Sequence, residues 1–339
     1  MSVDKLRPND PRAKKASVEV NGHRWYYLDA AAKGQQKGVV FLIHGFPDQA
    51  FGWRYQIPML NSLGLRCIAL QCMGYGDTGN SPNLRNYGFK AHADAVAGIA
   101  KAIGAHQIII GGHDWGGAVI FRVAQWYPRL VTHVFSVCTP FFRVNDSYVS
   151  VEQMVQGPVP QFGYQLQFGS EDFKVERAVG DDEGRMRTFL KGMYGGRPRG
   201  GGKFMTPERG IDLGLLEDEV AMTPLLDEEE FEYTVKEYMK NGLEGPCNWY
   251  RTRKINFEDD MHMPAEQKKG IQQPTLFIQA LRDNVLTPDL AKGMDKAIPN
   301  LTTGEVEATH WALWHTPQET NDIIKRWIEG VVFGGKSKL

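Results

Sequence analysis

The sequence predicts an α/β protein whose sheet is mostly parallel and covered by helices on both faces. Runs such as residues 38–43 and 108–112 are apolar throughout, as strands that are buried on two sides must be. Helical patterns, for example over residues 89–104, separate successive runs. With 339 residues, the chain is long enough to bury a large core and to carry an inserted second unit.

The N-terminal part predicts a hairpin followed by two buried strands. Residues 17–20 alternate between polar and apolar, Asn21-Gly22 is typical of a two-residue hairpin turn, and residues 25–28 resume the strand. The apolar runs 38–43 and 66–70 predict the next two strands, and glycine-containing segments follow both.

The strand–helix alternation stops at about residue 142 and returns after residue 264. The segment between is rich in Met, Tyr, Gly, Pro and charged residues. We therefore expect residues 1–141 and 265–339 to form one core, with residues 142–264 inserted as a helical cap. The remaining core elements that we expect are strands over 108–112, 131–138, 274–280 and 301–307 and helices over 89–104, 118–124 and 316–328.

Two stretches inside the insertion carry local predictions. The glycine- and arginine-rich run at residues 195–202 predicts a mobile loop. The acidic run Glu228-Glu229-Glu230 predicts a solvated helix start, where negative charge favours the N-terminal end of a helix.

Composition excludes several functional classes. Lys and Arg number 39 against 40 Asp and Glu, so electrostatics does not favour a nucleic acid or an anionic membrane as partner. No apolar run approaches the length of a membrane span, and residues 1–16 lack the apolar region of a secretory signal. The four cysteines have no C-x-x-C spacing, which indicates a reducing compartment with neither a disulfide framework nor a zinc site.

The chain ends in Ser337-Lys338-Leu339, a tripeptide that peroxisomal import receptors read at a C-terminus. We therefore expect the protein in the peroxisome, the cytoplasm or both, and not among secreted proteins. The import receptor would be its protein partner.

A glycine-rich turn joins the strand at 108–112 to the following helix. Glycines at 112, 116 and 117 surround Asp114, which matches the G-x-S-x-G nucleophile elbow with Asp in place of Ser. Such a turn points the central side chain toward a helix N-terminus, where negative charge is stabilised. The alternative is a glycine-rich turn in which Asp114 caps the helix.

Three catalytic residue types follow in the order Asp114, Asp283, His310. This is the chain order of nucleophile, acid and histidine in enzymes with a nucleophile elbow. Asp283 comes just after a predicted strand, and Asp289 and Asp295 are weaker candidates for the same role. His310 follows the last predicted strand.

A carboxylate at the elbow favours attack on sp³ carbon, because it is ionised near neutral pH and needs no base. The product is an alkyl ester on Asp114. His310 would then activate water to hydrolyse the ester, with Asp283 orienting the ring. The backbone N–H groups of Phe46 and Trp115 are the expected oxyanion hole.

The insertion carries two tyrosines in polar–aromatic contexts, Tyr164 and Tyr250. An epoxide that opens becomes an alkoxide, which needs a hydrogen-bond or proton donor, and a phenol with a pKa of about 10 is suited to that role. Either tyrosine alone is equally consistent with amphipathic packing.

Taken together, these motifs resemble the soluble epoxide hydrolases of the α/β-hydrolase superfamily. The resemblance covers most of the chain and rests on its His-Gly-Phe-Pro, Gly-His-Asp-Trp-Gly-Gly and Asn-Trp-Tyr-Arg motifs at 44–47, 112–117 and 248–251. It implies an eight-stranded sheet with a cap, and a reaction that needs no metal or cofactor. It also implies Asp114 as nucleophile, Asp283 and His310 as the charge-relay pair, and Tyr164 and Tyr250 as donors to the epoxide oxygen.

The resemblance carries further expectations. Mammalian members have an additional N-terminal phosphatase domain, and because this chain begins directly with the hydrolase we expect no phosphatase activity. A neutral urea or amide should inhibit by resembling the opening epoxide. Apolar pocket walls would suit aryl or alkyl epoxides, including those of fatty acids. The expected pocket residues are His44, Pro47, Phe162 and Trp311, together with Phe46 and Trp115.

Two other functions remain as alternatives. Haloalkane dehalogenases also place Asp before Trp at the elbow, but they typically have Asn where this chain has Phe46, and a halide does not need the paired tyrosines. A ligand-sensing receptor of the same fold usually keeps Ser at the elbow or lacks a triad member, whereas all three roles are filled here.

Overall fold

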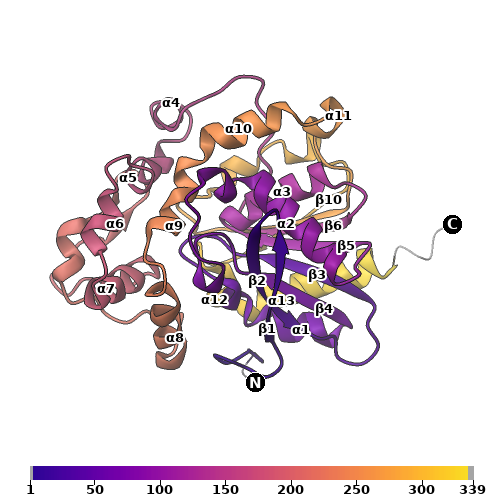
Figure 1. Ribbon diagram of the computed structural model, residues 1–339, viewed down its shortest axis with the longest axis horizontal. Helices are drawn as coiled ribbons and strands as arrows, with labels where there is room; N and C mark the ends of the chain where they lie inside the picture. Colours follow the sequence, from indigo (N-terminus) through magenta and orange to yellow (C-terminus); the bar gives the residue numbers. More distant parts are fainter. Residues whose placement is uncertain (1–2, 335–339) are drawn as a thin grey trace. The chain divides into compact units, whose positions relative to one another are not determined.

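The computed structural model describes residues 3–334, and the chain divides into two compact units (Figure 1). The first, here called the core unit, combines residues up to 72, residues 89–144 and residues from 262 onward. The second, the helical unit, combines residues 73–88 and 145–261. The insertion thus runs from 145 to 261, against the expected 142 to 264. Residues 73–88 lie in the helical unit, whereas the sequence placed them in the core.

The core unit is built on one eight-stranded sheet in the order β1-β2-β4-β3-β5-β6-β9-β10. β2 pairs antiparallel with both β1 and β4, and all other neighbours are parallel. The predicted eight-stranded, mostly parallel sheet is therefore confirmed. The strands are β1 (Lys14–Val20), β2 (His23–Ala30), β3 (Gly38–Ile43), β4 (Leu65–Leu70), β5 (Ile108–His113), β6 (Val131–Val137), β9 (Thr275–Ala280) and β10 (Leu301–Val306).

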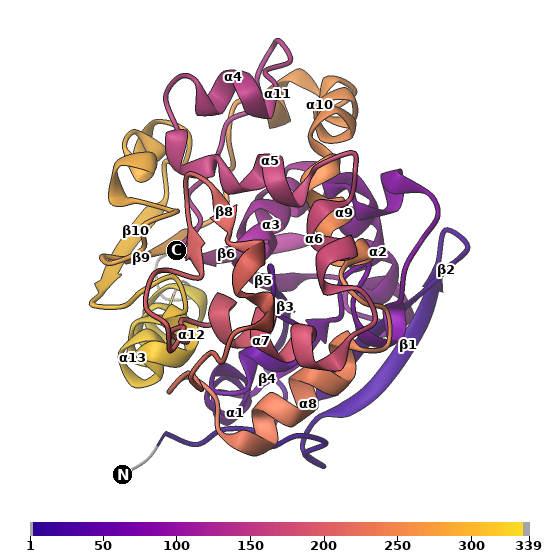
Figure 2. The same cartoon turned by 90° about the vertical axis from the view of Figure 1, so that its left-hand side faces the viewer.

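Helices cover both faces of this sheet. The chain moves along the sheet in one direction from β3 to β4 and in the other from β4 to β5 and β6. Because crossovers between parallel strands are right-handed, the connecting helices lie on opposite faces. Accordingly, α2 packs with α3, and α1 packs with α13 (Figure 2). The core helices are α1 (Gln56–Ser62), α2 (Phe89–Ala102), α3 (Trp115–Trp126), α11 (Ala265–Lys268), α12 (Ala312–His315) and α13 (Pro317–Trp327).

The closing helix α13 shows how the local sequence specifies a core helix. Pro317 occupies its first turn, where a missing N–H costs nothing. Lys325 and Arg326 lie in the last turn, where positive charge favours the helix dipole. The side chains that it buries recur every three to four residues. They are Thr320, Asn321, Ile324 and Trp327.

The strand order also determines where a ligand can be bound. The chain leaves β3 toward β4 on one side and returns to β5 on the other, so the sheet has its topological switch point between β3 and β5. Ligands of open α/β sheets bind outside the carboxyl ends of the strands at this point. The segments that follow β3 and β5 begin at His44 and Asp114.

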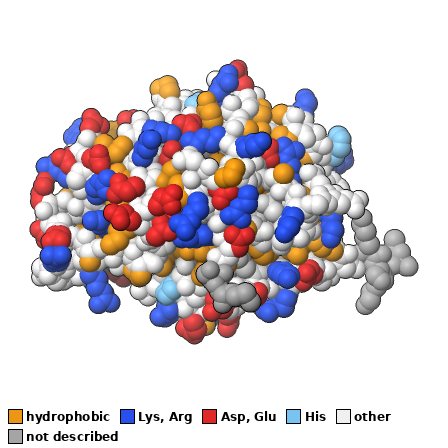
Figure 3. All heavy atoms as spheres, turned by 90° about the horizontal axis from the view of Figure 1, so that it is seen from below, with side chains coloured by type: hydrophobic (Ala, Val, Ile, Leu, Met, Phe, Trp, Pro, Cys, Tyr) orange, Lys and Arg blue, Asp and Glu red, His pale blue; other side chains and the backbone are white. Residues whose placement is uncertain are grey.

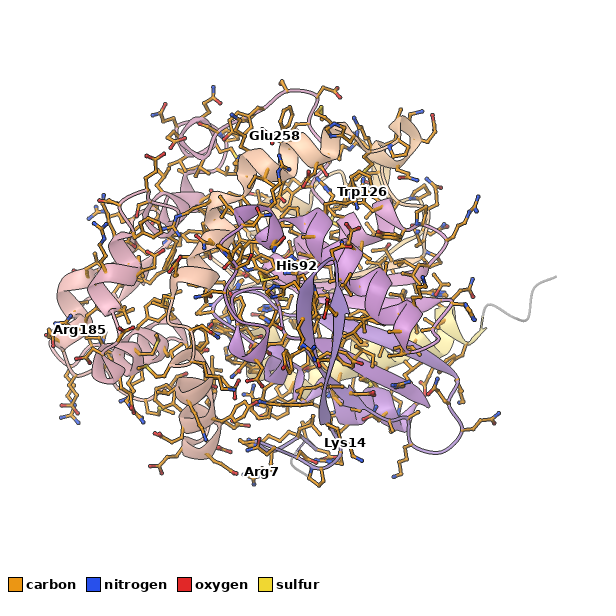
Figure 4. The ribbon with its side chains drawn as sticks, in the orientation of Figure 1. Arg7, Lys14, His92, Trp126, Arg185 and Glu258 are labelled. Atoms are coloured by element: carbon orange, nitrogen blue, oxygen red, sulfur yellow. The ribbon has the colours of Figure 1, made fainter. Side chains whose placement is uncertain are left out.

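The helical unit consists of short helices and one small hairpin. Residues 73–88 belong to it because Trp249 donates its indole N–H to the carbonyl of Met73 (2.9 Å) and Arg85 pairs with Glu258 of α10 (2.7 Å; Glu258 is labelled in Figure 4). Its elements are α4 (Val151–Val155), α5 (Tyr164–Phe168), α6 (Lys174–Val179), α7 (Glu183–Met193), β7 (Met205–Thr206), β8 (Gly210–Ile211), α8 (Glu228–Tyr238), α9 (Glu244–Asn248) and α10 (Arg253–Met261).

The structure bears on both local predictions in the insertion. The glycine-rich run at 195–202 contacts the chain at 219–221, since Arg199 N–H donates to the Glu219 carbonyl and Ala221 N–H to the Arg197 carbonyl, both at 2.9 Å. The acidic run begins α8 as predicted, with Glu228 and Glu229 exposed, but Glu230 is fully buried, and its side chain accepts from Asp227 N–H in a capping box.

Charged side chains of both signs are interleaved on the surface shown in Figure 3. This mixture agrees with a formal net charge of −1. Within residues 3–334, no helix combines the length and apolar character that a membrane crossing requires. Ser337-Lys338-Leu339 lies outside the described residues.

Candidate active site

Asp114 lies at the turn between β5 and α3 in a strained backbone conformation. Its φ is 55° and its ψ −126°, a region that residues with side chains seldom adopt. The hydroxyl of Thr139 donates to the Asp114 carbonyl (2.7 Å) and so helps to hold the turn. The Asp114 side chain makes no N-cap hydrogen bond to the second or third residue of α3, which argues against the helix-cap alternative.

The glycines of the elbow are required by close backbone approach. A Cβ on Gly112 would lie 2.4 Å from the carbonyl oxygen of Gly116, and a Cβ on Gly116 would lie 2.1 Å from that of Ile43. Both distances are far below van der Waals contact with atoms that cannot rotate away. The pattern Gly112–x–Asp114–x–Gly116 is therefore a steric requirement of this turn.

Two backbone N–H groups act on the Asp114 carboxylate. Phe46 N–H donates to Oδ1 at 2.8 Å, and the N–H of Trp115 is a second donor. Gly45 permits this approach, because a Cβ there would lie 2.3 Å from Oδ1. Burial raises the pKa of Asp114, and His310 and the two N–H groups partly offset the rise. The two donors expected from the sequence thus meet at one carboxylate.

Asp283 and His310 form a short hydrogen bond. Nδ1 of His310 lies 2.7 Å from Oδ2 of Asp283, whose side chain is fully buried. The other Asp283 oxygen accepts from the N–H groups of Val285 and Leu286 at 2.8 and 2.9 Å. Burial raises the pKa of Asp283, but His310 and these donors outweigh it, so the pKa lies below its usual range. Asp289, the weaker candidate, is 80% exposed and pairs with Lys292.

The opposite ring nitrogen of His310 faces the elbow, with Nε2 3.5 Å from Oδ2 of Asp114. Burial lowers the pKa of His310, but the negative charges of Asp283, Asp114 and Asp48 outweigh it and raise the pKa to about 9. At neutral pH the ring is therefore a cation between two carboxylates.

His113 and Cys138 hold the backbone of His310, a role that the sequence did not reveal. Nε2 of His113 lies 2.7 Å from the His310 carbonyl oxygen, and Sγ of Cys138 lies 3.4 Å from it. Because a carbonyl only accepts, Nε2 of His113 carries the proton. Burial and the neighbouring His310 lower the pKa of His113 to about 3, so its ring is neutral. The only sequence signal was its place next to Asp114.

A third carboxyl, Asp48, was also missed. It is buried directly after the His-Gly-Phe-Pro motif, and its Oδ1 accepts from Gln49 N–H at 2.7 Å. Burial raises its pKa to about 7, and the charge of Asp114 contributes to the rise. An acidic residue next to this motif was the signal that could have found it.

His44 was expected to line the pocket, but in the core unit it binds backbone groups instead. It is fully buried, its Nε2 accepts from Cys72 N–H (3.1 Å), and its Nδ1 lies 2.9 Å from the Gly45 carbonyl oxygen. Burial lowers its pKa to about 3, so it is a neutral support of the loop. Trp311 lies edge-on to His310, with ring centroids 5.4 Å apart, and Pro47 is buried in the same loop as Phe46.

In the helical unit, the two predicted tyrosines lie beside each other. The rings of Tyr164 and Tyr250 are 5.8 Å apart at 79°, and both side chains are buried. Phe168 contacts both rings, stacked on Tyr250 at 5.2 Å and edge-on to Tyr164 at 6.0 Å. Phe162, the remaining predicted pocket residue, is buried in the preceding turn.

Across residues 3–334, no three His, Cys, Asp or Glu side chains are grouped in a way that could hold a metal ion. The cysteines at 67, 72, 138 and 247 are free and buried.

The chain matches a protein-family model and is similar to several known proteins. A family model described as the α/β-hydrolase fold matches residues 38–317. The protein named epoxide hydrolase srdG of Neurospora crassa is 35% identical over 343 aligned residues, which cover 97% of this chain and 99% of that one. Bifunctional epoxide hydrolase 2 of Sus scrofa is 32% identical over 86% of this chain, and the match spans 51% of the pig protein.

A solved structure agrees with these matches. The crystal structure of epoxide hydrolase A from Mycobacterium thermoresistibile superimposes with a TM-score of 0.79 at 26% identity, over 94% of this chain and 98% of that one. The match includes residues of both units, because neither unit alone contains 94% of the chain.

Proposed function

This chain belongs to the α/β-hydrolase fold family, and from that membership we propose that it adds water to epoxides through an ester intermediate on Asp114. Its relatives named epoxide hydrolases support the reaction class. The observation that carries the mechanism is the environment of the Asp114 carboxylate. It accepts from Phe46 N–H at 2.8 Å, has Trp115 N–H as a second donor, and lies 3.5 Å from Nε2 of His310. This arrangement suits a carboxylate nucleophile whose ester is then hydrolysed.

In the first step, an Asp114 oxygen forms a bond to one epoxide carbon as the bond from that carbon to the ring oxygen breaks. The ring oxygen takes a proton from a tyrosine hydroxyl, for which we propose Tyr164 and Tyr250. The products are a hydroxyalkyl ester and a tyrosinate. The strained ring supplies the driving force, and donation to the developing alkoxide lowers the barrier.

In the second step, His310 accepts a proton from water as the water oxygen attacks the ester carbonyl. The tetrahedral oxyanion is stabilised by the N–H groups of Phe46 and Trp115. The intermediate then collapses, the leaving diol oxygen takes the proton from His310, and the resulting Asp114 carboxylic acid returns a proton to the tyrosinate. The sum is epoxide plus water giving a vicinal diol.

Ester formation also prepares His310 to act as a base. The charge of Asp114 is one of the causes that raise the pKa of His310 to about 9. Once Asp114 is esterified that charge is gone, so the pKa of His310 falls toward neutrality. The ring would then release its proton to solvent after the first step, when a base is needed, and take one up again once the Asp114 carboxylate is restored.

We assign the helical unit the role of a cap that supplies the tyrosine donors. We further propose aryl and alkyl epoxides as substrates, with a neutral urea or amide as inhibitor. Import into the peroxisome through Ser337-Lys338-Leu339 stays a prediction, because these residues lie outside the described ones. A fluorescent fusion with and without this tripeptide tests it.

The mechanism is tested by intact-protein mass spectrometry with styrene oxide. Asp114→Ala should form neither ester nor diol, because no carboxylate is left to attack. His310→Gln should accumulate a mass increase equal to one epoxide, because the ester forms but water is not activated. Asp289→Ala, an exposed carboxylate removed in the same way, should behave like the wild type.

Diol production by Asp114→Ala at the wild-type rate would contradict the mechanism. Halide release from a chloroalkane, with no turnover of styrene oxide, would instead favour a dehalogenase.

A further inference from the structure

The guanidinium of Arg251 joins the two segments that carry the tyrosines of the helical unit. Arg251 directly follows Tyr250, and its Nη2 and Nε lie 2.8 and 3.3 Å from the carbonyl oxygen of Ser170. Ser170 comes two residues after α5 ends, and α5 begins with Tyr164. The Arg251 side chain, next to Tyr250, therefore binds the backbone segment that follows α5, the helix of Tyr164.

Two further donors of this guanidinium are also used. Nη1 donates to Oδ1 of Asn248 at 3.0 Å, and Nη2 lies 2.7 Å from Oε1 of Glu176 in α6. The guanidinium also stacks on the ring of Phe173, 4.4 Å from its centroid. The pair is shielded from water, with 11% of the Arg251 side chain and 9% of the Glu176 side chain exposed. Only a planar fork of donors can make these bonds together, so Lys cannot replace Arg.

The turn that Arg251 binds needs external support. Phe173 has a left-handed backbone with φ 54° and ψ 45°, which is unfavourable for an aromatic residue. The aromatic ring of Phe173 lies against the guanidinium of Arg251. The same guanidinium donates two hydrogen bonds to the carbonyl of Ser170, which lies in the same turn. The contacts with Arg251 therefore favour this conformation between α5 and α6.

The same turn sets the spacing of the tyrosines. Gly169 packs so closely on the Tyr250 backbone that a Cβ there would lie 2.9 Å from the Tyr250 carbonyl oxygen. Phe168, one residue earlier, contacts both tyrosine rings, with its centroid 6.0 Å from that of Tyr164 and 5.2 Å from that of Tyr250. A shift of this turn would move Phe168 and so change the relative positions of the two hydroxyls.

We propose that Arg251 is a positioning residue that fixes the Tyr164–Tyr250 pair for donation to one epoxide oxygen. The inference rests on the proposed function, because it concerns the tyrosines' role in ring opening. In this proposal, Arg251 affects only ring opening and formation of the ester on Asp114. Hydrolysis of the ester by His310 and Asp283 should not depend on it.

The test measures ester formation by itself, in the His310→Gln background where the ester accumulates. Arg251→Met should slow this accumulation about tenfold, a part of the 10²–10⁴ that a positioned proton donor contributes. The matched control is Arg187→Met, which removes an arginine of the same unit that pairs with Glu232 and Glu183 and is 31% exposed. It should leave the rate unchanged.

A second readout is independent of how much protein is folded. With one enantiomer of styrene oxide, attack at the benzylic carbon inverts that centre and attack at the terminal carbon retains it, so the ratio of diol enantiomers reports the carbon attacked. Misplaced tyrosine hydroxyls should change this ratio in Arg251→Met and in Arg251→Lys, which keeps a positive charge beside Glu176. Both variants are made with His310 intact. Loss of folded protein lowers the yield without changing the ratio.

The variant Tyr250→Phe distinguishes the tyrosine-donor mechanism from the positioning role of Arg251. If Tyr250→Phe slows ester formation but the Arg251 variants match Arg187→Met in both rate and diol ratio, the positioning role is wrong and the proposed function stands. If Tyr250→Phe has no effect on ester formation, the tyrosine mechanism fails, and the positioning role fails with it. Slower ester formation with a changed diol ratio in the Arg251 variants supports the proposal.

Discussion

At the scale of single residues, the site depends on charges that are buried together. Asp114, Asp283 and Asp48 surround His310, and their combined field keeps the ring protonated despite its burial. Backbone N–H groups stabilise all three carboxylates without adding charge. Phe46 and Trp115 act on Asp114, Gln49 acts on Asp48, and Val285 and Leu286 act on Asp283. His113 is kept neutral by burial and fixes the His310 backbone. The site thus combines one titrating histidine with one that does not titrate near neutral pH.

The raised pKa of His310 predicts a pH-dependent contribution to stability. An unfolded histidine titrates near 6.5, and the folded value is about 9, so the contribution is complete below pH 6.5 and is lost as pH rises through 9. Its upper limit is about 3 kcal/mol, from 1.36 kcal/mol per pKa unit. The free energy of unfolding of the wild type should therefore exceed that of His310→Gln by more at pH 6 than at pH 10.

Denaturant unfolding of both proteins at the two pH values measures this difference, and groups common to both cancel. A stability difference between the proteins that is the same at pH 6 and pH 10 would show that His310 does not titrate in this range.

At the scale of elements, the strand–turn–helix of β5 and α3 is the unit that places Asp114, the proposed nucleophile. Its glycines are determined by backbone atoms that approach within 2.1–2.4 Å of a would-be Cβ. The same element order also explains the neighbours of Asp114, because β3 and β5 are adjacent at the switch point and their following loops meet.

Gly116→Ala tests this steric requirement. The new methyl group would meet the Ile43 carbonyl, so we expect a loss of roughly 1–3 kcal/mol in stability, typical of overpacking. Activity of the folded fraction should also fall, because relief of the clash moves Asp114. Gly330→Ala, where a Cβ meets nothing within 4 Å, is the control and should be neutral or slightly stabilising. Equal stability of the two variants would contradict the requirement.

At the scale of the whole molecule, our proposed mechanism divides two tasks between the two units. The core unit holds the Asp114–His310–Asp283 group on the ends of parallel strands. The helical unit holds the tyrosine pair on short helices joined by buried polar contacts. Our proposed mechanism needs both units, since it assigns the nucleophile to one and the proton donors to the other.

A neutral dialkylurea tests this division. Its carbonyl would accept from Tyr164 and Tyr250 while its N–H donates to Asp114, in imitation of the opening epoxide. We expect competitive inhibition, measured against styrene oxide, and at least a tenfold weaker inhibition constant in Tyr250→Phe, since one hydrogen bond to the carbonyl is lost. Failure to compete at millimolar concentration, or equal inhibition of Tyr250→Phe, would count against the tyrosine assignment.

The sequence by itself determined the elements and the chemistry of the elbow. Strand and helix periodicity, the hairpin at Asn21-Gly22 and the glycines around Asp114 are local properties, so a single chain displays them without its fold. This is why the mostly parallel sheet was predicted correctly. By contrast, the burial of His44 and of Glu230 depends on what the rest of the chain packs around them, and there the predictions needed correction.

Only the tertiary structure decided which distant groups act together. Strand order, which no local pattern encodes, brings Asp283 to within 2.7 Å of His310 and leaves Asp289 in solvent. The fold also brings His113 and Cys138 into hydrogen-bonding distance of the His310 carbonyl oxygen. It buries Asp48, and this burial raises the pKa of Asp48. The physical reason is that desolvation and hydrogen-bond geometry depend on everything packed around a group, whereas the sequence lists only its chain neighbours.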